Sequence, residues 1–203
     1  MSSNKITTIL LLIFLSTVLF SCKKEIKPPP HKLFEDAKQV MNKANEVLGE
    51  KVLFAVSGNF ISDSLKSIVA GVEISDKKQF GIQFYLIEWI DDEFQKTYST
   101  GLIDGSFDQC TVNKIKFTDF KNELIYFNSD SYYMGSSGGE VFAYIIDFKG
   151  KNTFSAHLTV ASGGMIVLEL SDNIKNRRMQ EFFTGYFKRD YPNLSVIQSE
   201  TSI

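Results

Sequence analysis

The chain has 203 residues, a formal net charge of −2, 43% hydrophobic residues and 13% aromatic residues. This length fits one domain with a substantial core. The sequence has no excess of basic residues of the kind that is typical of nucleic-acid-binding proteins, so no nucleic acid is expected among the partners.

The N-terminal segment combines one cation with an apolar run. Lys5 precedes residues 9–20, which are apolar apart from Ser16 and Thr17. A run of this length is typical of a signal-peptide h-region and is too short to cross a bilayer as a mature helix. It ends in Leu19-Phe20-Ser21-Cys22: a branched apolar residue, a tolerated position, a small residue and a cysteine.

Residues 19–22 resemble the lipobox of Gram-negative bacterial lipoproteins. The resemblance implies a type II signal peptide over residues 1–21, cleavage before Cys22 and lipid on its thiol, so the membrane is an expected partner. Lys23 in place of Asp resembles the sorting pattern for the outer membrane. Because residues 23–27 are net basic, the periplasmic face is favoured over the cell surface. The alternative is an ordinary secretory signal, although its cleavage sites favour A-x-A.

Residues 22–31 are expected to form a tether, because the run Pro28-Pro29-Pro30 favours an extended chain. A single domain then spans residues 32–203. Its first element is a helix over residues 32–48, where apolar residues recur at spacings of four and three. Gly49 is a suitable residue to end this helix.

Alternating apolar residues then predict strands. These strands cover residues 52–56, 66–74, 79–90, 94–103, 110–117 and 123–128. The strand at 79–90 is apolar on both faces and is expected inside the sheet. A break in the alternation near Asn113 predicts a β-bulge. The acidic run Asp91-Asp92-Glu93 is interpreted as a hairpin tip. The alternative, a Ca²⁺ site, would need alternating carboxylates.

A hairpin follows, with strands at 141–148 and 153–160 and a turn at 149–152. The second strand is apolar on one face and polar on the other, as in a strand with one solvated face. A further strand is predicted over residues 165–170.

The chain closes with a predicted helix from residue 174 to about residue 190. Ser171 or Asp172 is the expected cap, and Pro192 the expected stop. Gly185 costs helix stability, so a close packing contact is expected there. The apolar face is expected to contain Ile174, Phe182, Phe183, Tyr186 and Phe187. The tail after residue 192 is expected to add a short strand.

Together these elements predict an α+β domain. We expect an antiparallel, meander-type sheet of about eight strands, framed by an N-terminal and a C-terminal helix.

A glycine- and serine-rich segment before the hairpin is the candidate binding loop. Its residues are Tyr132, Tyr133, Gly135, Ser136, Ser137, Gly138, Gly139 and Glu140. Glycines let the backbone approach a ligand, and tyrosines supply contact area at low entropic cost. The alternative is a flexible connection between two strands. The segment matches neither a phosphate-binding loop nor a nucleophile elbow, so no catalytic residue is assigned.

Two isolated residues receive structural interpretations. Cys110 is predicted to be buried in the core, since lipidation of Cys22 leaves it without a disulfide partner. His157 lies on the polar face of its strand and is interpreted as a surface residue. Neither a metal site nor a cofactor is predicted, because metal sites need clustered ligands.

The expected function is that of a membrane-anchored, non-enzymatic binding module, with another envelope protein or a small ligand as its partner. The alternative is an envelope hydrolase that uses acidic residues, with glycans as substrates. A deep cleft with two facing carboxylates would favour the hydrolase. A shallow, aromatic-rich surface would favour the binding module.

Overall fold

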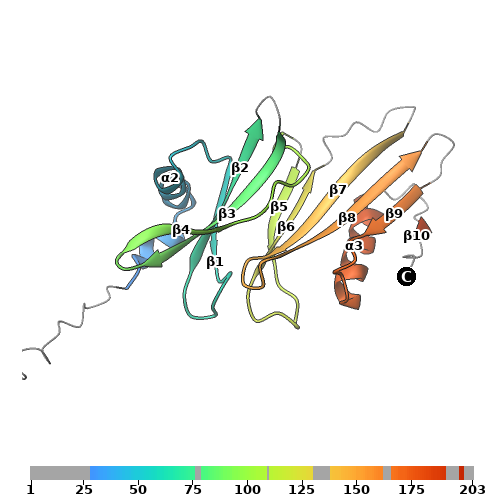
Figure 1. The fold of residues 1–203 in the computed structure, drawn as a ribbon. Coiled ribbons are helices and arrows are strands. Elements are labelled where there is room, and N and C mark those ends of the chain that lie inside the picture. Colours follow the sequence, from blue (N-terminus) through green and yellow to red (C-terminus); the bar gives the residue numbers. More distant parts are fainter. Residues whose placement is uncertain are drawn as a thin grey trace, which may run out of the picture.

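The computed structural model describes residues 28–75, 79–108, 110–129, 138–161, 166–190 and 197–198. Within these residues the chain is α+β, with two sheets and two α-helices (Figure 1). Helix α2 (Ala37–Leu48) packs on the first sheet, and α3 (Arg177–Asp190) packs on the second. The predicted α+β class is confirmed. The prediction of one sheet of about eight strands is wrong, and each helix covers one of two sheets.

The first sheet has the order β1-β2-β3-β4, and every neighbouring pair is antiparallel. Its strands are β1 (Phe54–Gly58), β2 (Ser67–Ser75), β3 (Phe80–Ile90) and β4 (Glu93–Ser99). The predicted interior position of the third strand is confirmed.

The second sheet has the order β10-β9-β8-β7-β6-β5, antiparallel except for the pair β9 and β10, which is parallel. Its strands are β5 (Cys110–Ile115), β6 (Leu124–Ser129), β7 (Gly138–Asp147), β8 (Asn152–Ala161), β9 (Ile166–Leu170) and β10 (Ile197–Gln198). The first sheet is a meander, and so are strands β5 to β9 of the second, so the predicted antiparallel pairing of consecutive strands holds within these two sets.

The two-sheet arrangement buries both faces of strands that are apolar on both sides. In β3, Phe84 faces a core shared with the second sheet, whereas Ile87 faces α2. In β6, Phe127 faces the shared core, whereas Tyr126 faces α3. Each sheet can bury both faces only between a helix and the other sheet.

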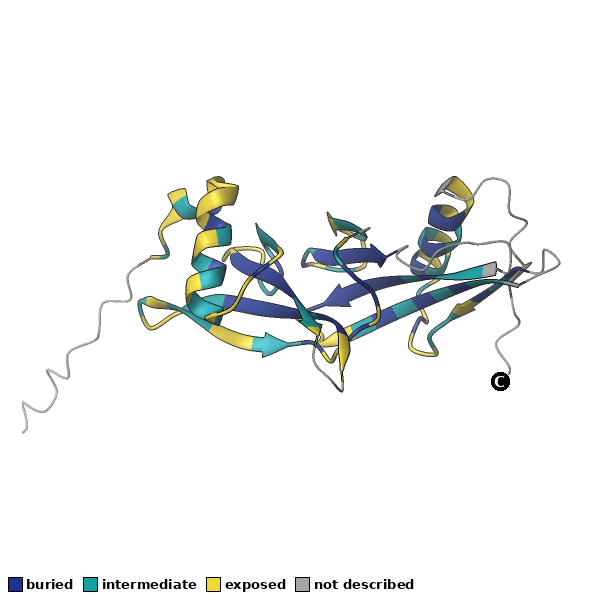
Figure 2. Cartoon of the chain, turned by 90° about the horizontal axis from the view of Figure 1, so that it is seen from above, coloured by how far each residue is buried: buried dark blue, intermediate teal, exposed yellow. Residues whose placement is uncertain are grey.

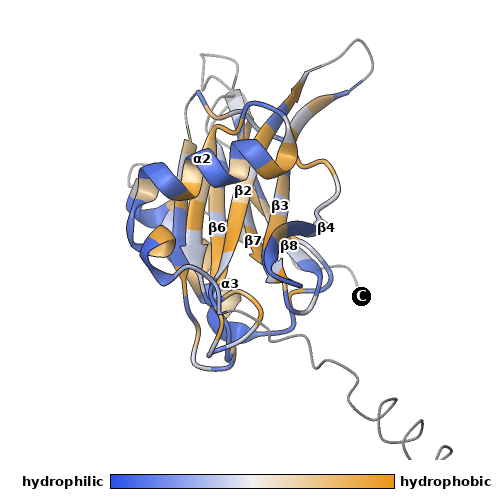
Figure 3. Ribbon diagram, turned by 90° about the vertical axis from the view of Figure 1, so that its left-hand side faces the viewer, coloured by the Kyte–Doolittle hydropathy of each residue, from blue (hydrophilic) through white to orange (hydrophobic). Residues whose placement is uncertain are grey.

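The resulting layers follow the order α2, first sheet, second sheet, α3 (Figure 1). Figure 2 shows buried residues along the central strands and exposed residues on the outward sides of the helices. Figure 3 views the layers face-on from the α2 side, with hydrophilic residues on the helix in front of hydrophobic strands. No helix in the described parts of the chain is long and apolar enough to span a membrane.

The predicted N-terminal helix is divided at Asp36. Residues His31–Glu35 form a 3₁₀ helix, η1, before α2 begins. The Asp36 carboxylate caps α2 by accepting hydrogen bonds from the backbone N–H groups of Lys38, at 2.8 Å, and Gln39, at 3.2 Å. Gly49 ends the helix in the left-handed conformation, with φ of 69°, as predicted.

Two local predictions about the strands have different outcomes. The predicted hairpin tip is confirmed, since Asp91 and Asp92 connect β3 to β4 with φ of 52° and 70°. The prediction of a β-bulge near Asn113 is wrong, because β5 pairs with β6 in continuous register. The irregularity lies instead between Leu86 and Ile87, where β3 meets β4.

The start of the C-terminal helix differs from its prediction. Neither Ser171 nor Asp172 caps α3, because Asn176 Oδ1 accepts hydrogen bonds from the N–H groups of Arg178 and Met179. Ser171 Oγ instead accepts the N–H of Ser155 in β8.

The predicted apolar face of this helix is largely buried. Ile174, Phe183, Tyr186 and Phe187 are buried in the core beneath α3, and Phe182 packs at its margin. The prediction of a close packing contact at Gly185 is wrong, because a β-carbon there would meet no atom within 4 Å.

Candidate functional site

The predicted binding loop lies partly outside the described residues. Tyr132, Tyr133, Gly135, Ser136 and Ser137 are not described, and neither is the lipidation residue Cys22. The described end of the loop forms the start of β7. Gly138 and Gly139 pair there with Ala161 and Val160 of β8, and Glu140 pairs with Thr159.

This pairing places Glu140 beside His157, which sequence reasoning had treated as an isolated residue. Glu140 Oε2 lies 3.4 Å from His157 Nε2, and Glu169 Oε2 of β9 lies 3.9 Å from His157 Nδ1. Thr159 Oγ1 lies 3.4 Å from the same Nε2. One imidazole is therefore flanked by two carboxylates that come from the two strands adjoining its own.

An aromatic ring supports the imidazole. Phe142 is directly opposite His157 in the β7–β8 register. Their ring centroids are 4.3 Å apart and their planes differ by 7°. The stack holds the histidine ring against the sheet and directs its nitrogens toward the two carboxylates. Sequence reasoning missed Phe142 and Glu169, since neither lies in the predicted loop.

Phe142 packs at the margin of the core between the sheets, and the other side chains of this group lie outside that core. The core between the sheets includes Phe127 of β6 and Tyr144 of β7, but no residue of β8 or β9. On β8 the same face carries Thr153, Ser155, His157 and Thr159, all of them half-buried. We call Glu140, Phe142, His157, Thr159 and Glu169 the binding face.

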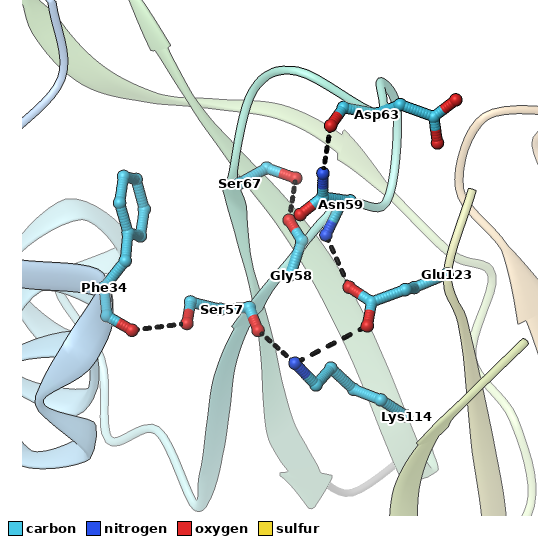
Figure 4. Close-up of polar contacts among 8 residues, drawn as sticks. All are labelled: Phe34, Ser57, Gly58, Asn59, Asp63, Ser67, Lys114 and Glu123. Atoms are coloured by element: carbon cyan, nitrogen blue, oxygen red, sulfur yellow. Dashed lines mark hydrogen bonds and ion pairs between the residues drawn. The ribbon is translucent and has the colours of Figure 1, made fainter. Parts of the chain in front are cut away.

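A polar junction at the other edge of the second sheet fixes the two sheets relative to each other (Figure 4). The carboxylate of Glu123, just before β6, accepts the backbone N–H of Asn59 at 2.6 Å. The Lys114 ammonium lies 3.7 Å from the same carboxylate and donates to the Ser57 carbonyl at 2.9 Å. The Ser57 hydroxyl in turn donates to the Phe34 carbonyl at 2.9 Å.

The junction joins β1 to β5 and to the loop before β6, which is the side of the second sheet away from β8 and β9. With contact made at this edge, the first sheet covers the face of β5, β6 and the part of β7 that carries Tyr144 and Ile146. The Glu140 end of β7 and the strands β8 and β9 contribute no residue to the core between the sheets.

Cys110 is only half-buried, so its assignment to the fully buried core is wrong. It opens β5, the edge strand of the second sheet, and packs at the margin of the core between the sheets. Its thiol lies 3.6 Å from the carbonyl oxygen of Phe107. The edge position explains the exposure, because no strand among the described residues pairs with β5 on its outer side.

The acidic runs outside the binding face are parts of turns. Asp91 and Asp92 form the β3–β4 tip, and Asp63 lies in the β1–β2 loop, where its carbonyl accepts from the Asn59 side chain at 2.6 Å. Among the described residues, no group of three or more histidine, cysteine, aspartate or glutamate side chains has the geometry of a metal site.

Comparisons of this chain with protein-family models, with curated proteins and with solved structures gave no match.

Proposed function

We propose that this protein is a lipid-anchored, non-enzymatic binding module of the cell envelope. Its anchor is Cys22, lipidated after removal of residues 1–21, and its location is the outer membrane, on the periplasmic side. The observation that supports the binding role is the part of the second sheet outside the core between the sheets, where a stacked His157 lies between Glu140 and Glu169.

The chemistry of this face favours a basic partner. Glu140 and Glu169 form no ion pair with any lysine or arginine among the described residues. The binding face carries two carboxylates and neither lysine nor arginine, which makes it negatively charged. A lysine or arginine side chain of a partner protein would add charge-assisted hydrogen bonds, while Phe142 and His157 supply a flat contact surface.

The same geometry gives no support to the hydrolase alternative. The Glu140 side chain is 47% exposed and the Glu169 side chain is 65% exposed. Glycoside hydrolases rely on one carboxylic acid that its surroundings desolvate. Two exposed carboxylates fit recognition of a charged partner better than acid catalysis.

Carboxyl-to-amine cross-linking in intact envelopes tests the binding face directly. A zero-length carbodiimide reagent should couple Glu140 or Glu169 to a lysine of the partner, and mass spectrometry of the adduct should identify both residues. The double variant Glu140→Gln with Glu169→Gln should lose this adduct. The matched control is Glu46→Gln, which removes a glutamate that is 68% exposed on α2. An adduct that survives in the double variant would place the partner elsewhere.

The predicted loop provides a second test of the binding role. Because Tyr132 and Tyr133 precede Glu140 closely in the chain, we expect them to contribute to partner contact. Tyr132→Ala with Tyr133→Ala should abolish the cross-link at an unchanged melting temperature. A large fall in melting temperature would instead give the two rings a structural role.

Membrane fractionation tests the anchor separately. Cys22→Ser should prevent lipidation and release the protein from the membrane fraction, since acyl chains contribute about 0.8 kcal/mol per buried CH₂ group. Retention of the Cys22→Ser protein in that fraction would contradict the anchor, whatever the result of cross-linking.

A further inference from the structure

A cavity of about 320 Å³ lies between the first described residues of the chain and the first sheet. Its apolar wall consists of Pro28, Pro29, Ile61, Leu65 and Trp89. Sites for small molecules have volumes of about 300–1,000 Å³, so this cavity suits a small ligand. None of its residues belongs to the binding face.

The apolar wall has one firmly held ring and one exposed side chain. The Trp89 indole packs edge-on against Phe94, with centroids 4.9 Å apart and planes at 69°. Leu65 is 58% exposed at the cavity. An apolar chain in the cavity would contact Trp89 and remove Leu65 from water, and this burial favours binding.

Lys66, in the lining of the cavity, can bind an anionic group. Lys66 contributes to the lining and forms no ion pair with any carboxylate among the described residues. Glu88 also lines the cavity, but its Oε2 accepts the Thr97 hydroxyl at 2.6 Å, which holds it toward β4. His31 completes the charged or titratable lining. The Lys66 ammonium is thus available to a ligand.

We propose that this cavity binds a single-chain anionic amphiphile, with a short apolar tail along Trp89 and Leu65 and a carboxylate head at Lys66. The tail supplies burial of apolar area, and the head supplies a charge-assisted hydrogen bond. None of the binding-face residues lines this site, and the ligand contacts proposed here involve no lipid on Cys22.

Trp89 is the single tryptophan of the chain, so its fluorescence reports on the cavity wall alone. The experiment uses the full-length chain with Cys22→Ser, which keeps every cavity residue and removes the proposed lipidation site. Decanoate, below its micelle concentration, should change the Trp89 emission saturably with one molecule per chain. Decanol, which lacks the charge, should bind more weakly.

Substitutions at two exposed residues separate the contributions of the ligand's head group and of its apolar tail. Lys66→Gln should weaken decanoate binding about tenfold and leave decanol binding unchanged, because only the carboxylate uses the ammonium. Leu65→Ser should weaken both ligands. Lys38→Gln, on α2 and away from the cavity, is the control and should affect neither.

Three outcomes would overturn the proposal. The first is an emission change that does not saturate. The second is an equal loss of decanoate and decanol binding in Lys66→Gln. The third is a Trp89 response to phosphatidylcholine vesicles but not to decanoate, which would make this end of the domain a membrane contact rather than a ligand cavity.

Discussion

A β-carbon on Gly58 would lie 2.6 Å from the Glu123 carboxylate oxygen Oε2, which is the atom that accepts the Asn59 N–H. The Phe60 ring lies 2.8 Å from the same point. Gly58→Ala should therefore displace the carboxylate and loosen the junction between the sheets. We expect a loss of about 1–3 kcal/mol of unfolding free energy, measured by urea denaturation. A loss below the error of the measurement would contradict this account of the junction.

Gly185→Ala should have the opposite effect. Gly185 lies inside α3, and a β-carbon there would meet no atom within 4 Å. Since alanine costs less backbone entropy than glycine in a helix, the substitution should stabilise the protein by about 0.5–1 kcal/mol. A fall in the unfolding free energy would reveal a close contact at this position. Gly58→Ala and Gly185→Ala together compare a glycine that has close neighbours with one that has none within 4 Å of a β-carbon.

Gly185 illustrates what the sequence could and could not predict. The apolar faces of most strands and of both helices were predictable, because burial follows the period of the residue pattern. The division into two sheets was not, since a strand with two apolar faces, such as β3, fits equally well inside one large sheet. Whether a helical glycine packs closely depends on neighbours distant in sequence, and periodicity carries no information about them.

The sequence did not predict the binding face because the pairing register of β7 and β8 differs from the predicted one. A turn at residues 149–152 would place Tyr144 opposite His157. The observed turn precedes Asn152, which pairs with Asp147, and this register brings Phe142 opposite His157. The two registers expose the same face of β8, so its alternating pattern fits either one. Glu169 joins the face through a third strand, whose register depends on a separate connection.

Two phenylalanines of α3 should differ in their effect on stability. Phe187 is fully buried, whereas Phe182 packs at the margin of the core, with its ring 5.6 Å from that of Phe117. Phe187→Ala should cost about 3–5 kcal/mol, and Phe182→Ala should cost clearly less. Thermal or urea denaturation of both variants measures the difference. Equal losses would show that α3 is rotated relative to the packing described above.

Asp119 should make the attachment of α3 sensitive to acid. Its carboxylate accepts a hydrogen bond from the Asn176 side chain at 2.8 Å and lies 3.3 Å from Arg178 Nη1. The hydrogen bond from Asn176, assisted by the Arg178 charge, lowers the pKa of Asp119 below its ordinary value of 3.8. Because the pKa is lower in the folded state, the contact stabilises the protein above the unfolded-state pKa. This stabilisation is lost as the pH falls through the folded-state pKa.

The variant Asp119→Asn should therefore melt at a lower temperature than the wild type at about pH 7, and this difference should disappear in acid, well below pH 3.8. The ionic strength should be low, since both groups are largely solvent-exposed. Asp172→Asn is the control, because Asp172 is exposed just before α3 and lies outside this contact. A difference that persists unchanged in acid would show that the Asp119 charge is not what attaches the helix to the loop before β6.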